Sequence, residues 1–283
     1  MKKTFLICAC FLFSSINITY AQESSTYKFV NNLIDAYYEG HLAYDKFNEM
    51  GDYKSVGMAM KEAMDSKSYT IINKEKLLIL PYISMKEKGM TEEKLRDNTL
   101  TMNYHLKKIK SILEPYLNDP DHWVQIFARL SVTLEESIAI NEASPDIILK
   151  IMDKGENAYD ELSDEQKGIL RTYQYFPGFV GFYLDKIPQV LIENFQYGQS
   201  GPINFKLSKQ ERQMLIKKID QEFADRIKLA ESHKNVSNLE MSMNPYELNI
   251  YVYLISSLRK MLTYDKYEDA GCADIKTTLA SGC

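Results

Sequence analysis

Beyond residue 21, apolar side chains recur along the chain every three or four positions, the spacing of amphipathic α-helices. One such stripe passes through Leu215, Ile219 and Phe223. Only residues 250–255 have the β-branched and aromatic composition of a strand, and the polar residues around them favour a helix. The pattern predicts helices over residues 24–49, 53–66, 70–88, 91–117, 120–142, 145–161, 164–176, 178–197, 208–234 and 245–266.

Capping signals indicate where several of these helices begin. A polar residue followed by proline occurs at Asp119-Pro120, Ser144-Pro145 and Asn244-Pro245. Proline suits the first helical position because the N–H group it lacks has no partner there. Thr91 is followed by two glutamates, and Ser208 and Glu211 have the spacing of a capping box. Pro81 and Pro115 should kink or end the helices that contain them.

The predicted fold class is therefore all-α. We expect one globular domain over residues 22–283, built from eight to ten antiparallel or orthogonally packed helices. Glycine and proline concentrate near residues 198–207, which form the longest predicted loop and the place where the domain would subdivide.

The first 21 residues predict export. Lys2 and Lys3 precede an apolar run that is too short to span a bilayer comfortably, and the run ends at Ala21 with small side chains. This is the layout of a signal peptide cleaved after Ala21, so we expect a periplasmic or secreted protein with no integral membrane span after cleavage. A weaker alternative is a lipoprotein acylated at Cys10.

Charge narrows the classes of partner. After loss of Lys2 and Lys3 the chain retains 39 acidic residues and 32 basic ones, a net charge of −7. An acidic chain is poorly suited to binding nucleic acid or anionic lipid, because both need an excess of Lys and Arg. Cys272 and Cys283, the two cysteines left after cleavage, are predicted to form a disulfide in an oxidising compartment.

The sequence has no recognisable catalytic, metal-binding or cofactor-binding motif. His41 and Asp45 share a helix face and could contribute to a metal site, but a surface ion pair is favoured. Asp119 and His122 could act in proton transfer, although helix capping by Asp119 accounts for the pair. We therefore predict no catalytic residue, no metal ligand and no cofactor.

Aromatic residues cluster around Pro177-Gly178 and give the candidate binding residues. They could line an apolar pocket or form a wedge, but aromatic side chains at helical spacing more often pack in the core. The candidates are Tyr173, Tyr175, Phe176, Phe179, Phe182 and Tyr183.

These observations predict a non-enzymatic module that binds another protein, such as an inhibitor or immunity protein in the bacterial envelope. The acidic balance favours a partner with a basic surface, because complementary charge speeds association. One alternative is a carrier of an apolar small molecule in a pocket lined by the aromatic cluster. Another is a hydrolase that uses two carboxylates.

Overall fold

The computed structural model describes residues 24–52, 78–120, 124–125, 128–173 and 207–232, together with residues 255, 258–259 and 262–263. Among these residues the regular elements are all helical and none is a strand, which confirms the all-α class for the part described. The elements are α1 (Ser25–Glu49), α3 (Leu80–Ile83), α4 (Glu92–Leu113), η2 (Glu114–Tyr116), α6 (Leu130–Lys154), η3 (Gly155–Glu161) and α8 (Lys209–Ser232). Residues 164–173 are also helical.

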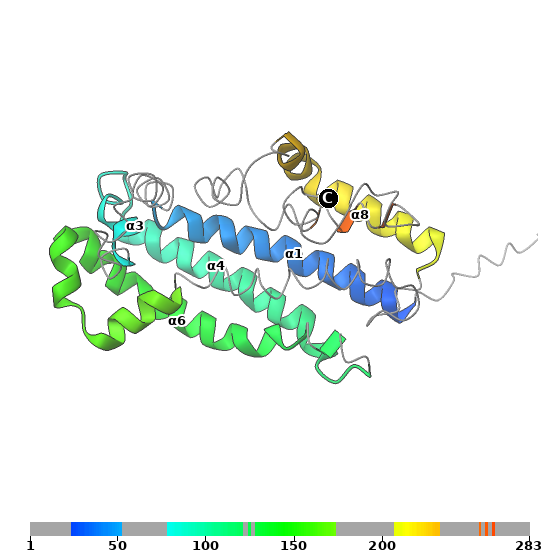
Figure 1. Cartoon of the computed structure of the whole chain (residues 1–283), viewed down its shortest axis with the longest axis horizontal. Coiled ribbons are helices and arrows are strands. Elements are labelled where there is room, and N and C mark those ends of the chain that lie inside the picture. The colour runs from blue at the N-terminus through cyan, green and yellow to red at the C-terminus, as the bar shows by residue number, and fades with distance from the viewer. Residues whose placement is uncertain are drawn as a thin grey trace, which may run out of the picture.

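The four long helices lie side by side in the order α8, α1, α4 and α6 (Figure 1). Asn32 near the start of α1 donates a hydrogen bond to the hydroxyl of Tyr116, just beyond the end of α4, at 2.8 Å. Arg96 near the start of α4 pairs with Asp146 in the second half of α6 at 2.7 Å. These contacts show that α4 runs antiparallel to both α1 and α6 and lies between them.

Helix α1 is enclosed by the rest of the molecule. From Phe29 to Glu49 it has no exposed residue, and Glu39, His41 and Asn48 in this stretch are buried. A buried polar group is costly unless it forms hydrogen bonds or ion pairs. The polar side chains of α1 therefore determine which groups on the neighbouring helices must face it.

Several predicted caps are confirmed. The Thr91 side chain accepts a hydrogen bond from the backbone N–H of Lys94 at 3.2 Å. Ser208 and Glu211 form a complete capping box, in which the Glu211 N–H donates to Ser208 Oγ at 3.2 Å and the Ser208 N–H donates to Glu211 Oε2 at 2.7 Å. Pro115 follows the end of α4 and lies in η2, as expected of a residue that ends a helix.

The predicted helix start at Ser144-Pro145 is wrong, because α6 continues through both residues. Pro145 has no N–H to donate to the carbonyl of Asn141, one helical turn earlier. The hydroxyl of buried Ser144 donates to that carbonyl at 2.9 Å and so removes much of the cost of an interior proline. Helix α6 begins instead at Leu130.

The prediction of helix through residue 88 is also wrong. Helix α3 ends at Ile83, and turns follow it as far as Gly89, which has a φ of 84°. Glycine adopts this left-handed conformation without the steric penalty of a Cβ atom. The turn brings the N–H of Met90 to the carbonyl of Met85 at 2.9 Å and leads into the Thr91 cap.

Several predictions fall outside the described residues. They concern the signal peptide, the predicted helix over 53–66, the 198–206 part of the long loop, the Asn244 cap, and Cys272 with Cys283. Among the described helices, none has the length and apolarity needed to cross a bilayer.

Candidate functional site

Tyr173 is the only member of the predicted aromatic cluster among the described residues, and it lies in the core. Its ring is fully buried, with its centroid 5.1 Å from that of Phe47, and its hydroxyl lies 3.6 Å from Met50 Sδ. Burial raises the pKa of Tyr173 well above its ordinary value, Tyr82 adds to this effect, and a hydrogen bond with Ser144 opposes it. The remaining candidates, from Tyr175 to Tyr183, are outside the described residues.

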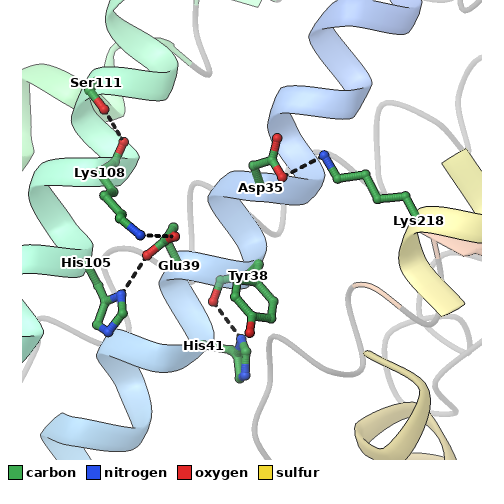
Figure 2. Close-up of polar contacts among 8 residues, drawn as sticks. All are labelled: Asp35, Tyr38, Glu39, His41, His105, Lys108, Ser111 and Lys218. Carbon is green, nitrogen blue, oxygen red and sulfur yellow. Dashed lines mark hydrogen bonds and ion pairs between the residues drawn. The ribbon is translucent and has the colours of Figure 1, made fainter. Parts of the chain in front are cut away.

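The buried carboxylate of Glu39 joins α1 to α4. Its Oε2 lies 2.6 Å from His105 Nδ1, and its Oε1 accepts a hydrogen bond from Lys108 Nζ at 3.0 Å (Figure 2). A carboxylate only accepts hydrogen bonds, so Nδ1 carries the hydrogen in this contact. Glu39 is therefore held between two donors on adjacent positions of the α4 surface.

A second ion pair joins α1 to α8. Asp35 lies 2.6 Å from Lys218 Nζ (Figure 2). The same ammonium group also donates a hydrogen bond to the side-chain oxygen of Asn31 at 3.0 Å. Glu222 lies one turn further along α8, and its Oε2 is buried without a hydrogen-bond partner. Burial raises the pKa of Glu222, Asp35 raises it further, and Lys218 lowers it.

His41 is buried between α1 and α8, so the predicted surface position of its side chain is wrong. The ring donates from Nδ1 to the backbone carbonyl of Tyr38 at 2.6 Å and packs against Phe223, with centroids 5.4 Å apart. Glu39 instead points toward α4, as expected for residues two positions apart on a helix (Figure 2). The described residues contain no group of three or more His, Cys, Asp or Glu side chains placed to hold a metal ion.

These polar contacts explain how the helices pack, whereas the most distinctive surface lies on α4. The face of α4 that points away from its buried stripe consists entirely of exposed residues, spaced alternately four and three positions apart. We call this row the outer face of α4: Glu93, Asp97, Leu100, Tyr104, Lys107 and Ser111. Leu100 is 67% exposed and Tyr104 is 55% exposed, so the middle of the row is apolar and accessible.

The two α4 residues that Glu39 holds, His105 and Lys108, both contact the ring of Tyr104. Lys108 Nζ, held by Glu39, lies 4.6 Å from the centre of the Tyr104 ring. The ring of His105, also held by Glu39, meets the Tyr104 ring edge-on with centroids 5.3 Å apart. The hydrogen bond to Glu39, followed by one to Tyr104, raises the pKa of Lys108 and keeps it charged. Tyr104 is thus supported from two sides by groups that share one buried carboxylate.

Acidic side chains of α6 run along one edge of the outer face. They pair with basic residues of α4: Glu135 with Lys110, Glu142 with Lys107 and Asp146 with Arg96. From residue 128 to residue 173, the chain has ten acidic and five basic residues, and all ten acidic residues are exposed. The apolar centre of the outer face therefore has a charged rim of acid–base pairs on its α6 side.

Sequence reasoning did not identify the outer face, although a signal for it exists. The buried stripe of α4 includes Leu95, Met102 and Leu106. At 100° per residue, Leu100 lies about 200° from Met102 and so falls on the opposite side of the helix. Two large apolar residues on the side opposite the buried stripe indicate either a second buried face or a binding surface, and the exposure of Leu100 and Tyr104 supports the second interpretation.

Comparison of the chain with protein-family models, curated proteins and solved structures finds no match.

Proposed function

We propose that the chain is an exported, non-enzymatic module that binds another protein through the outer face of α4. The single observation that carries this proposal is the exposed pair Leu100 and Tyr104, one helical turn apart in the middle of that face. Protein-binding surfaces commonly combine an apolar or aromatic centre with a charged rim.

The support beneath Tyr104 strengthens the proposal. A tyrosine held by Lys108 and His105 loses little conformational entropy when a partner covers it. Both supporting groups are fixed by Glu39, which is buried and therefore cannot itself form the binding surface. The position of the ring is thus set in advance by a buried carboxylate that a partner does not touch.

Charge suggests the chemistry of the partner. The excess of exposed acidic residues from 128 to 173, and the net charge of −7 after the predicted cleavage, favour a protein with a basic contact surface. The place of action that we propose is the periplasm or the exterior of a bacterial cell, on the basis of the signal-like first 21 residues. The complete domain would contain the eight to ten helices that the apolar pattern predicts.

Affinity capture from the native envelope and culture fluid tests this function. The wild-type chain should retain a specific protein, and the Leu100→Ser/Tyr104→Ser double variant should lose at least about 90% of that retention, because it removes the apolar centre. Val132→Ser is the matched control, since Val132 is 59% exposed on α6 but lies outside the outer face. Equal capture by all three proteins would reject the outer face of α4 as the binding surface.

A further inference from the structure

The spacing of the outer face suits contact with another helix. Its six residues alternate steps of four and three positions, which is the spacing of the contact line in a coiled coil. Such a row runs nearly parallel to the helix axis, so a second helix can follow it over several turns. The flanking helices α1 and α6 pack against α4 on either side (Figure 1). The six positions of the row remain exposed.

The order of side chains along the outer face is complementary to its own reverse. The row has acidic residues in its first third, Leu100 and Tyr104 in its centre, and Lys107 and Ser111 in its last third. Reversing the row about the level of Met102 places Leu100 against Tyr104, Asp97 against Lys107 and Glu93 against Ser111. A parallel copy would instead place Asp97 against Asp97 and Lys107 against Lys107, which is unfavourable.

We propose that the partner bound by the outer face of α4 is a second copy of the same chain, packed antiparallel about a two-fold axis that crosses the outer face at the level of residue 102. This inference rests on the proposed function and names the occupant of the same surface. In the pair, Leu100 contacts the partner's Tyr104, and Asp97 forms an ion pair with the partner's Lys107. Two-fold symmetry repeats both contacts, so each contact occurs twice in the dimer.

Lys107 is the basic residue that the outer face of a second copy offers to Asp97, because Arg96, Lys108 and Lys110 of α4 are already held in ion pairs. From Glu92 to Leu113 this helix carries five basic and three acidic residues, whereas the neighbouring segment 128–173 has an acidic excess. Lys107 lies 3.9 Å from Glu142, and both side chains are more than half exposed, so this ion pair is weak and Lys107 can turn toward a second copy. With only two large apolar side chains from each copy, the pair should be reversible rather than obligate.

Sedimentation velocity of the mature chain over a range of concentrations tests the proposal. The wild type should shift reversibly from monomer to dimer as concentration rises. Asp97→Lys and Lys107→Glu each place like charges opposite one another twice, so each should weaken self-association by about tenfold or more. Glu136→Lys is the matched control, because it changes the charge of an exposed residue of α6 outside the outer face and should leave the dissociation constant within about threefold of wild type.

Mixing the two charge variants gives the most specific measurement. In a mixed pair, both ion pairs have opposite charges again, so the mixture should associate about as tightly as the wild type although each variant alone is monomeric. The Asp97→Lys/Lys107→Glu double variant should recover self-association for the same reason. Circular dichroism of each variant checks that the helical fold is retained.

The other outcomes separate this inference from the function on which it rests. A dimer unaffected by the single charge variants would overturn the antiparallel arrangement. A wild type that remains monomeric, while capture of a different protein still depends on Leu100 and Tyr104, would overturn the second copy as partner and leave the proposed function standing. A monomer that captures nothing through these residues would overturn both.

Discussion

Glu39 and Lys108 form an ion pair between α1 and α4, with 3.0 Å separating the carboxylate oxygen from the ammonium nitrogen. The carboxylate is largely buried, whereas the ammonium reaches the surface and lies over the exposed ring of Tyr104. A residue in the interior therefore fixes the geometry of a residue on the outer face of α4. This relationship leads to a prediction about both stability and binding.

Glu39→Gln should reduce the free energy of unfolding by about 1–2 kcal/mol, because the neutral amide loses the charge-assisted hydrogen bonds to His105 and Lys108. It should also weaken binding at the outer face, since both supports of Tyr104 are loosened. Urea unfolding and binding titration measure the two effects. Glu136→Gln on α6 is the control and should change stability by less than about 0.5 kcal/mol. Unchanged binding in a folded Glu39→Gln protein would show that Glu39 does not position Tyr104.

Ser144→Ala should reduce the free energy of unfolding by about 2 kcal/mol, because the buried carbonyl of Asn141 loses its donor and Pro145 cannot supply another. Ser137→Ala is a close control. Its hydroxyl also donates to a carbonyl of α6, that of Thr133 at 3.1 Å, but this carbonyl has an ordinary helical N–H donor as well. The free energies of unfolding of the two variants, measured by urea denaturation, should therefore differ clearly. Equal losses would contradict this account of the interior proline.

The carboxylate of Glu211 connects the starts of two helices. It accepts hydrogen bonds from the backbone N–H groups of Ser24, at 3.0 Å, and Ser208, at 2.7 Å. Partial burial acts to raise its pKa, but the hydrogen bonds from Ser24 and Ser208 outweigh burial and lower the pKa from 4.5 to about 2. The stability contributed by ionised Glu211 is thus fully present above about pH 4.5 and is lost as pH falls toward about 2.

Glu211→Gln should therefore be less stable than the wild type at neutral pH, and the difference should shrink as the solution is acidified through that interval. Thermal unfolding of both proteins at a series of pH values measures the difference. A stability difference between the wild type and Glu211→Gln that stays constant down to the lowest pH would mean that the ionised form of Glu211 has no special role at the two helix starts.

Glu222 should show the opposite pH dependence. Because burial raises the pKa of Glu222, the folded protein favours the protonated carboxyl group. The stability that protonated Glu222 contributes is present at low pH and is lost as pH rises through the folded-state pKa. Glu222→Gln should accordingly be more stable than the wild type at neutral pH, with a smaller gain at pH 4. Urea unfolding of both proteins at neutral pH and at pH 4 measures the difference in their free energies of unfolding and so tests this prediction. A variant less stable than the wild type at neutral pH would contradict it.

Local signals in the sequence predicted the helix starts where one residue and its near neighbours determine the structure. Thr91 and the Ser208–Glu211 pair cap α4 and α8 as expected, because their partners lie within three positions along the chain. The same reasoning failed at Ser144-Pro145. There the serine hydroxyl bonds backward to Asn141 within a buried helix, and no local pattern distinguishes this contact from a cap.

The candidate site depended on contacts that are distant along the chain. Glu39 and His105 are 66 positions apart, so nothing near either residue indicates their contact. The periodicity of α4 placed Leu100 and Tyr104 on one side of the helix, but whether that side is covered depends on where α1 and α6 pack. The sequence therefore predicted the class of fold and several helix ends but did not reveal the binding surface.

Photo-crosslinking in the native cell envelope tests the central claim most directly. A photoreactive phenylalanine derivative in place of Tyr104 should give a cross-linked protein product on irradiation, because this position lies at the centre of the outer face. The same derivative in place of Val132, an exposed residue of α6 away from that face, is the control and should give little product. A strong product from position 104 and little from position 132 is the result that the account predicts. No product from position 104, or equal products from the two positions, would contradict it.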